Sequence, residues 1–287
     1  MRSGFVALAG RPNVGKSTLV NALCGGKVVI TSDKPQTTRR RILGVANGDG
    51  HQLVLADLPG FQRPLDELTE RMQRAVDIAF EDVDAVLFVL SARERVGGGD
   101  RFIAKRVFEL GRPVVIAVNK VDRLKPAHVV SQIQAAAALG DFHALHPVSA
   151  KTGDGIVGLR EELVGLLPEG PAYFPPDQRT DLSVELQIGE LIREKALDLT
   201  KEEVPHAITV EVQELGEKVV RANLLVETDS QKQILVGKRG SMVREIGTRA
   251  RPEIEQLLGR RHVFLDLQVK VRPRWRRDEG LLGRLGI

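Results

Sequence analysis

The sequence predicts an α/β domain with a mostly parallel sheet, followed by a smaller α+β domain. Two observations lead to this prediction. Apolar runs of strand length alternate with helical patterns over the first part of the chain, which is typical of a parallel sheet covered by helices on both faces. A proline-rich stretch then ends the alternation, and a different order of elements follows it. We therefore expect a first domain over residues 1–168, a semi-rigid linker over 169–180 and a second domain over 181–287.

The elements of the first domain follow from apolar runs and helical periodicity. Strands are predicted at five runs: Phe5–Ala9, Leu53–Ala56, Ala85–Leu90, Val114–Val118 and Ala144–Val148. A first helix starts near Thr18, and further helices are predicted at Glu67–Phe80, Asp100–Leu110, His128–Leu139 and Ile156–Leu167. This order places the ends of several parallel strands at one edge of a sheet.

The second domain has its own order of elements. It begins with an amphipathic helix over Ser183–Leu199, and two alternating runs, Ala207–Gln213 and Val219–Thr228, then predict strands. The remaining elements are a helix at Gln231–Val236, the tetrapeptide Gly237-Lys238-Arg239-Gly240, a helix from Met242 and a strand at His262–Val271.

The segment from Gly10 to Ser17 fits the phosphate-loop pattern G-x-x-x-x-G-K-[ST]. It follows the first predicted strand and leads into the first helix, which is the context that this pattern requires. Backbone N–H groups there surround phosphates, Lys16 neutralises the β- and γ-phosphate charge, and Ser17 offers a hydroxyl to Mg²⁺. The expected contacts are Gly10, Asn13, Val14, Gly15, Lys16, Ser17 and Thr18. Because ATPases and small-molecule kinases share this pattern, other segments must identify the base.

Two later segments predict that the base is guanine. Asn119-Lys120-Val121-Asp122 follows a predicted strand, and the Asp122 carboxylate can accept hydrogen bonds from the ring N–H and the exocyclic amine of guanine. Adenine presents no such donor pair. Asn119 and Lys120 are expected to brace the loop and cover the base, and Ser149-Ala150-Lys151 can direct a backbone N–H at the guanine oxygen.

Residues for the metal and the γ-phosphate lie between these segments. Asp57, in Asp57-Leu-Pro-Gly60, ends a predicted strand and can hold Mg²⁺ through water, while Gly60 offers its N–H to the γ-phosphate. The polar stretch Thr31–Arg39 has no apolar period and is expected to be a mobile loop. One of its threonines should reach Mg²⁺, and we favour Thr38 over Thr37.

Taken together, these motifs resemble the bacterial Era family of GTPases, in the translation-factor-related class. The residues that carry the resemblance are Gly10 to Leu19, Pro35 to Arg39, Asp57 to Gly60, Asn119 to Asp122, Ser149 to Lys151 and the C-terminal stretch. It implies a P-loop GTPase domain with a six-stranded sheet, in which Arg41–Ala46 is an antiparallel edge strand. It also implies GTP hydrolysis with Lys16, Thr38 and Gly60 as catalytic residues, and a K⁺ ion near Asn13.

Phe61 occupies the place where small signalling GTPases carry the glutamine that orients the attacking water. Because Phe61 has no polar atom, we expect slow unaided hydrolysis. Gln62 is a weak substitute, since neighbouring residues of an extended loop point in opposite directions.

The second domain is similar to a prokaryotic-type KH RNA-binding domain. Two glycines around two basic residues let backbone and cations approach the phosphates of unpaired nucleotides. From Lys232 to the end there are 14 basic and 6 acidic residues, whereas Asp181–Gln231 has 5 and 12, so the positive charge gathers beside the tetrapeptide. Trp275, in a basic tail, either stacks on a base or packs in the core. The expected RNA contacts are Ile234, Gly237, Lys238, Arg239, Gly240, Arg244, Ile246, Arg274 and Trp275.

Composition agrees with an intracellular protein of two domains. The 287 residues suffice for two cores, and the single cysteine, Cys24, fits a reducing cytoplasm. His143 and His146 have no companion at ligand spacing and are expected to be structural or exposed. The resemblance implies a monomeric switch that binds the 3′ end of small-subunit ribosomal RNA and acts in small ribosomal subunit assembly. The alternatives are a tRNA-modification GTPase, a regulatory GTPase at the inner membrane face, and an RNA-binding module with an inactive nucleotide site.

Overall fold

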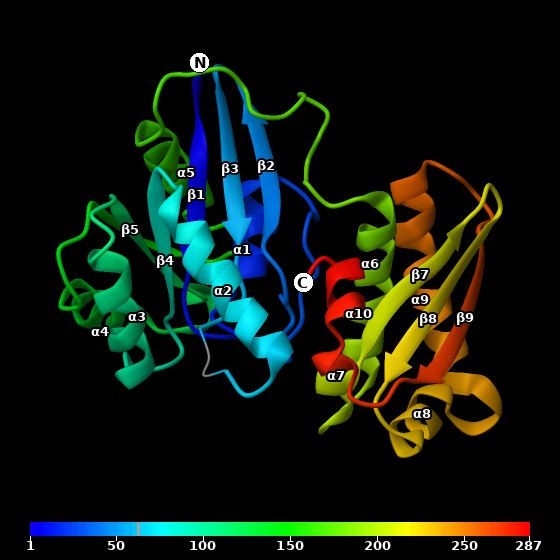
Figure 1. Cartoon of the computed structure of the whole chain (residues 1–287). Coiled ribbons are helices and arrows are strands. Elements are labelled where there is room, and N and C mark those ends of the chain that lie inside the picture. Colours follow the sequence, from blue (N-terminus) through cyan, green and yellow to red (C-terminus); the bar gives the residue numbers. More distant parts are fainter. Residues whose placement is uncertain (62–63) are drawn as a thin grey trace. The chain divides into compact units, whose positions relative to one another are not determined.

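The computed structural model of the protein describes residues 1–61 and 64–287, which form two compact units (Figure 1). The first unit comprises Met1–Val29, Thr38–Pro64 and Thr69–Asp181. The second comprises Ile30–Thr37, Leu65–Leu68 and Leu182–Ile287. Two short segments from the first part of the sequence therefore belong to the second unit.

The first unit is built on a six-stranded sheet with the strand order β2-β3-β1-β4-β5-β6. The strands are β1 (Arg2–Ala9), β2 (Ile42–Gly48), β3 (His51–Asp57), β4 (Ala85–Ser91), β5 (Val114–Asn119) and β6 (Ala144–Val148). Strand β2 is antiparallel to β3, and the other pairings are parallel. The predicted fold class, including the antiparallel edge strand, is confirmed.

Helices cover both faces of this sheet (Figure 1). They are α1 (Lys16–Leu23), α2 (Glu67–Glu81), α3 (Gly98–Phe108), α4 (Pro126–Ala137) and α5 (Ile156–Gly165), with a 3₁₀ turn at Val121–Arg123. Helices α1 and α5 contact each other and the sheet, while α2 and α3 contribute to the core on the other face. Strand β4 lies between them with every residue buried, which explains its continuous apolar sequence.

The proline-rich stretch belongs to the first unit and is bound by side chains of its sheet. The side-chain Oε1 of Gln52 accepts hydrogen bonds from the backbone N–H groups of Tyr173 (2.7 Å) and Phe174 (3.0 Å). Asn47 Nδ2 donates to the carbonyl of Pro176 at 2.9 Å. Its prolines exclude regular structure, and side chains of the sheet bind its backbone instead.

The second unit contains a three-stranded sheet with the order β7-β8-β9. Its elements are α6 (Val184–Leu199), α7 (Val204–Ala207), β7 (Thr209–Leu215), β8 (Val219–Val226), α8 (Asp229–Val236), α9 (Ser241–Leu258), β9 (Phe264–Val271) and α10 (Glu279–Arg284), with 3₁₀ turns at Lys238–Gly240 and Trp275–Arg277. Strand β8 pairs antiparallel with β7 and parallel with β9. The order confirms the predicted KH arrangement, while the short helices α7 and α10 were not predicted.

Candidate functional sites

The phosphate loop joins β1 to α1 at the carboxyl edge of the sheet. Gly15 precedes α1 with φ of 100°, and a Cβ atom there would lie 2.4 Å from Asn119 Nδ2, so only glycine fits. Lys16 is buried and its Nζ donates to the carbonyls of Gly10 and Arg11 at 3.1 Å each. Burial lowers the pKa of Lys16 to about 8, partly opposed by Asp57. A cation and a helix N-terminus here form a ready anion site.

Three oxygen-bearing side chains converge beside this loop. Ser17 Oγ donates to Asp57 Oδ2 at 2.7 Å, and Thr38 Oγ1 lies 3.0 Å from the same oxygen and 3.1 Å from Ser17 Oγ. Asp57 is fully buried, and its Oδ1 has no hydrogen-bond partner. Burial raises the pKa of the Asp57 carboxyl, against the opposing charge of Lys16. Hydroxyl and carboxylate oxygens with an orphaned buried acceptor fit Mg²⁺, a hard cation that prefers oxygen ligands.

The structure also separates the two candidate threonines. The Thr37 hydroxyl donates to the carbonyl of Lys34 at 2.6 Å, whereas the Thr38 hydroxyl lies with Ser17 and Asp57. This geometry agrees with the preference for Thr38.

Elsewhere, His143 and His146 both contact the carboxylate of Glu162, with closest N–O distances of 3.0 and 3.5 Å. Within residues 1–61 and 64–287, no group of three or more His, Cys, Asp or Glu residues could hold a metal ion.

A cavity of about 250 Å³ lies where β5 and β6 end. Asn119 braces it, because its Nδ2 donates to the Val14 carbonyl at 3.0 Å and its Oδ1 accepts from the backbone N–H groups of Lys120 and Ala150. Ser149 Oγ donates to Asp122 Oδ1 at 2.8 Å. The Ala150 N–H therefore already has a partner within the protein. The lining residues are Gly15, Thr18, Arg93, Asn119, Lys120, Asp122, Arg123, Ser149, Ala150 and Lys151.

Sequence reasoning missed two arginines of this cavity, Arg93 and Arg123. Arg123 directly follows the Asn-Lys-x-Asp motif, and Arg93 follows β4, the neighbour of β5. The position of Arg93 after a strand end was the available signal, because ligands of such sheets bind at the carboxyl ends of the strands.

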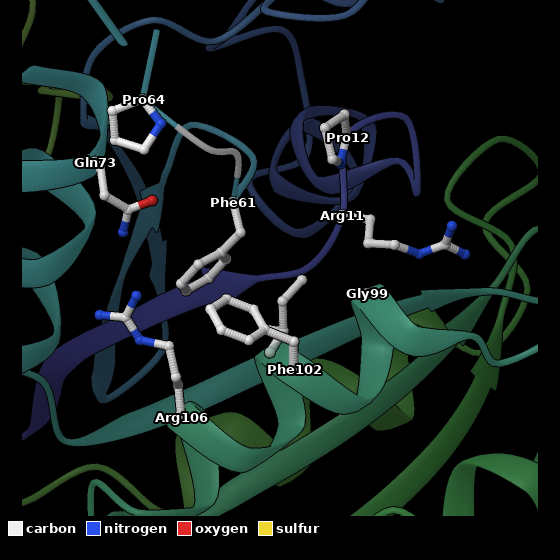
Figure 2. Close-up of a pocket in the computed structure, with 9 residues that line it drawn as sticks. Arg11, Pro12, Phe61, Pro64, Gln73, Gly99, Phe102 and Arg106 are labelled. Atoms are coloured by element: carbon white, nitrogen blue, oxygen red, sulfur yellow. The ribbon is translucent and has the colours of Figure 1, made fainter. Parts of the chain in front are cut away.

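Phe61 follows Gly60 and packs between α2 and α3. Its ring stacks on Phe80 with centroids 5.9 Å apart, and the guanidinium of Arg106 lies 5.4 Å from the ring centroid. Figure 2 shows the Phe61 ring directed toward Phe102 and Arg106, into a pocket of about 480 Å³. Phe61 thus anchors the loop to the core and brings no polar atom to the nucleotide. The proposed substitute, Gln62, lies outside the described residues.

The second unit presents the predicted basic turn. Gly237 ends α8 with φ of 70° and Gly240 precedes α9 with φ of 77°. Between them, Lys238 and Arg239 are exposed, and nearby Ile234 is 48% exposed. A Cβ atom on Gly237 would lie 2.8 Å from the backbone nitrogen of Met242, so the turn requires glycine. The two helices therefore meet at a turn with projecting cations.

Two expected RNA contacts are corrected by their burial. Ile246 is fully buried in the core of the second unit. Trp275 is also fully buried, and its Nε1 donates to the carbonyl of Ala207 at 2.8 Å. A base cannot stack on an indole that is enclosed by the core, so core packing is the correct alternative. Nor is the segment a tail, because it forms a 3₁₀ turn at Trp275–Arg277, and Arg272 before the turn pairs with Asp278 after it, while Arg274 remains exposed.

The phosphate loop, the oxygen cluster and the base cavity define the first unit as a P-loop GTPase, joined to a KH domain. Two family models match accordingly. One, described as a 50S ribosome-binding GTPase, covers residues 5–120, and the other, described as a KH domain, covers residues 203–276. Of the described residues, no helix is long and apolar enough to cross a membrane.

Relatives match over the full length. GTPase Era of Nocardioides sp. is 45% identical, over 100% of this chain and 96% of its own length. GTPase Era of Thermotoga maritima is 44% identical, over 100% and 98%. A crystal structure of Era in complex with MgGDPNP and nucleotides 1506-1542 of 16S ribosomal RNA matches with a TM-score of 0.95 at 38% identity, over 100% and 99% of the chains. A variant of Aquifex aeolicus Era bound to GDP.AlF4- has the same score, identity and coverage. The chain belongs to the Era family of GTPases.

Proposed function

We propose that this GTPase binds the single-stranded 3′ end of small-subunit ribosomal RNA through the Gly237–Gly240 turn and acts in small ribosomal subunit assembly. The observation that carries the proposal is the exposure of Lys238 and Arg239 between two glycines with positive φ, beside the exposed Ile234. Cations at a turn can approach phosphates closely, and an apolar neighbour can support a base. The match to the Era complex with 16S ribosomal RNA nucleotides supports the choice of RNA.

The proposed roles in GTP hydrolysis follow from the geometry of the first unit. Ser17 and Thr38 supply hydroxyl oxygens to Mg²⁺, and Asp57 holds it through water. When bound, Mg²⁺ neutralises charge on the β- and γ-phosphates. Lys16 stabilises charge on the transferred phosphoryl group, and Gly60 donates its N–H to the γ-phosphate. Since Phe61 cannot orient water, the unaided rate is slow.

Guanine is selected by Asp122, which Ser149 holds in place. Asn119 and Lys120 brace the cavity, and the backbone after Ser149 supplies a donor for the guanine oxygen. The KH match favours this function over that of a tRNA-modification GTPase, which needs a different appended domain. The presence of Lys16, Ser17 and Asp122 argues against an inactive nucleotide site.

We also propose that a K⁺ ion binds near Asn13. This residue is exposed in the phosphate loop with φ of 63°, and its carbonyl accepts a hydrogen bond from Lys120 Nζ at 2.5 Å. An exposed amide oxygen beside the phosphates suits a monovalent cation. Hydrolysis should therefore be faster in potassium than in sodium, and Asn13→Ala should abolish the difference. Equal rates of the unsubstituted protein in the two salts would contradict the proposal.

The RNA proposal is tested by replacing Lys238 and Arg239 together with aspartate. Repulsion then replaces attraction at the phosphates, so RNA affinity should collapse while GTP affinity persists, because the guanine cavity lies in the first unit. Replacing Arg74 and Lys105 with aspartate, on exposed helix faces of the first unit, makes the same change of net charge and should leave RNA affinity within about twofold at 0.15 M salt. Unchanged RNA binding by the Lys238 and Arg239 variant would place the RNA contact elsewhere on the second unit.

We expect a monomer that works in the cytoplasm, where ribosomal subunits are assembled, with peripheral contact at the inner membrane face as the alternative. Light scattering after size exclusion tests the monomer. Flotation with anionic vesicles tests the membrane contact, which predicts a bound fraction that falls with added salt.

A further inference from the structure

Arg11, in the phosphate loop, extends its side chain to helix α3 within the first unit. Its Nε donates to Asp100 Oδ1 at 2.7 Å, and its Nη2 lies 3.0 Å from Glu94 Oε2. The aliphatic part of the side chain packs on Gly99, where a Cβ atom would lie 2.9 Å from Arg11 Cδ. Figure 2 shows this path from the loop toward Gly99. A side chain therefore joins the phosphate loop to the first turn of a helix 89 residues later in the sequence.

Asp100 is a buried charge held by two partners. Its side chain is 2% exposed, and its Oδ2 accepts a hydrogen bond from the backbone N–H of Gly97 at 2.9 Å. The carboxylate thus lies at the N-terminus of α3, where the helix dipole favours negative charge. Burying a charge is costly unless hydrogen bonds and an opposite charge compensate for it. Arg11 supplies the opposite charge, so the desolvated carboxylate opposes any displacement of Arg11.

The backbone around Arg11 contacts two groups of the nucleotide site. The carbonyls of Gly10 and Arg11 each accept a hydrogen bond from Lys16 Nζ at 3.1 Å. Pro12 lies against Gly60, where a Cβ atom would be 2.8 Å from Pro12 Cγ. A side chain that holds Arg11 in place therefore restrains the two carbonyls that bind the Lys16 ammonium.

We propose that Arg11 is a positioning residue for GTP binding and hydrolysis, whose ion pair with Asp100 holds the phosphate-loop backbone so that the Lys16 ammonium meets the β- and γ-phosphates. The inference rests on the proposed role of Lys16. The phosphate-loop pattern accepts any residue at position 11, so the pattern assigns no function to Arg11. Asp100 lies outside the nucleotide-binding motifs and acts through Arg11. Helix α3 thereby supports the phosphate loop from a segment that no motif marks.

The test measures the affinity of the full-length protein for MgGDPNP and the rate of single-turnover GTP hydrolysis. Arg11→Met keeps the aliphatic contact with Gly99 and removes the charge and the donors. Both quantities should fall about tenfold, as expected for loss of hydrogen bonds from a charged donor. Arg11→Lys keeps the charge and one donor, and should recover both to within about threefold of the unsubstituted protein. An Arg11→Met variant within about twofold of the unsubstituted protein in both would overturn the proposal.

A double-mutant cycle tests whether Arg11 acts through Asp100. Asp100→Asn removes the charge and keeps an amide oxygen for the Gly97 N–H, so α3 retains this hydrogen bond at its N-terminus. The single change should lower MgGDPNP affinity about fivefold, and the double variant should bind no more weakly than Arg11→Met. Fold changes that multiply in the double variant would show independent effects and would overturn the proposal.

Two control variants separate positioning from changes in net charge or stability. Arg95→Met removes an exposed arginine just before α3 and makes the same change of net charge as Arg11→Met. Val107→Ala shortens a fully buried side chain of α3 and should lower the midpoint of thermal unfolding by about 5 °C. Both should leave MgGDPNP affinity within about twofold. A loss of about tenfold in either control would overturn the proposal, because net charge or instability would then explain the Arg11 variants.

Lys16→Ala separates this proposal from the proposed function on which it rests. If Lys16→Ala leaves MgGDPNP affinity and hydrolysis unchanged, the role of Lys16 is wrong and the inference fails with it. If Lys16→Ala lowers them but Arg11→Met does not, Lys16 keeps its role and the positioning proposal alone fails. With both active, Arg11→Met should add less than about twofold to the loss of affinity in the Lys16→Ala background. A full additional effect would show that Arg11 does not act through Lys16.

Discussion

Ser149 donates its hydroxyl hydrogen bond to Asp122 at 2.8 Å, and this contact joins the residues after β5 to those after β6. Ser149 is fully buried, so its own position is fixed by the core. The hydroxyl occupies one carboxylate oxygen, Oδ1. The orientation of the carboxylate toward the cavity is therefore set by a residue that follows a different strand.

Asp122→Asn should transfer preference from GTP to xanthosine triphosphate, whose ring carries an oxygen in place of the amine. The substitution replaces an acceptor with a donor, and mispaired polar groups in such a site cost several kcal/mol. Competition binding with both nucleotides measures the change. Ser149→Ala is the matched control: it should weaken both nucleotides without reversing the preference. An asparagine variant that retains its GTP affinity would show that Asp122 does not read the base.

Nucleotide binding should depend on the charge of Lys16. Burial lowers the pKa of Lys16 to about 8 without nucleotide, so the charge is lost as pH rises through that value. Phosphates favour the charged form and raise this pKa, so GDP affinity should fall above pH 8 and binding should take up a proton. Calorimetry in two buffers of different ionisation enthalpy detects the proton. If GDP binding at pH 9 took up no proton, the lowered pKa of Lys16 would be contradicted.

Lys16 also predicts how stability without nucleotide depends on pH. Between pH 8 and the ordinary lysine value of 10.5, the unfolded chain holds more protons than the folded chain. The contribution of this residue to the free energy of unfolding therefore rises with pH in that window. Lys16→Met should remove the rise, which is measured as the difference between denaturation curves of the two proteins at pH 8 and pH 10.

Phe61→Ala should leave unaided hydrolysis within about tenfold, roughly 1.4 kcal/mol, because no side-chain atom there orients water. It should lower the free energy of unfolding by about 1–3 kcal/mol, since the ring packs on Phe80 and under Arg106. Phe61→Leu retains apolar contact, and its stability should lie between that of the unsubstituted protein and that of the alanine variant. Single-turnover kinetics and denaturant unfolding measure both effects. Hydrolysis that drops by orders of magnitude in a folded alanine variant would refute this role.

Trp275→Phe should destabilise the protein by about 2–4 kcal/mol, through loss of the hydrogen bond to Ala207 and of buried volume. RNA affinity of the folded protein should change less than about twofold. Arg274→Ala, at the exposed neighbouring residue, should weaken RNA binding more than the Trp275 change does. A larger loss of RNA affinity from Trp275→Phe than from Arg274→Ala would show that the indole contacts RNA.

The strands of the first unit could be predicted because parallel strands buried on both faces leave a plain apolar signal. In β5, Val114–Asn119, every residue is buried, and the predicted run Val114–Val118 is shorter than the strand by one residue. The nucleotide-binding motifs could also be predicted, because the geometry of a single loop requires their glycines and charged residues. Helices α7 and α10 escaped notice since they are too short to show a helical period.

What could not be predicted depends on contacts between residues distant in sequence. The surroundings of Trp275 are basic, which suggests exposure, but its partner is a carbonyl 68 residues away. Arg193 and Thr37 are 156 residues apart in sequence, and no sequence motif predicts the hydrogen bond between them. The local sequence pattern indicates which residues have functional side chains, whereas tertiary packing determines which of those side chains are buried.

The hydrogen bonds from the proline-rich stretch to Gln52 bear on how the protein can be dissected. Gln52 is 1% exposed in the whole protein, and a chain that ended at residue 168 would lack the N–H groups of Tyr173 and Phe174 that bind its amide oxygen. Such a fragment would also lose Asp181, whose carboxylate accepts a hydrogen bond from the backbone N–H of Leu43 at 2.9 Å. An excised GTPase fragment should therefore extend through Asp181, and shorter fragments are expected to aggregate at the β2 edge of the sheet.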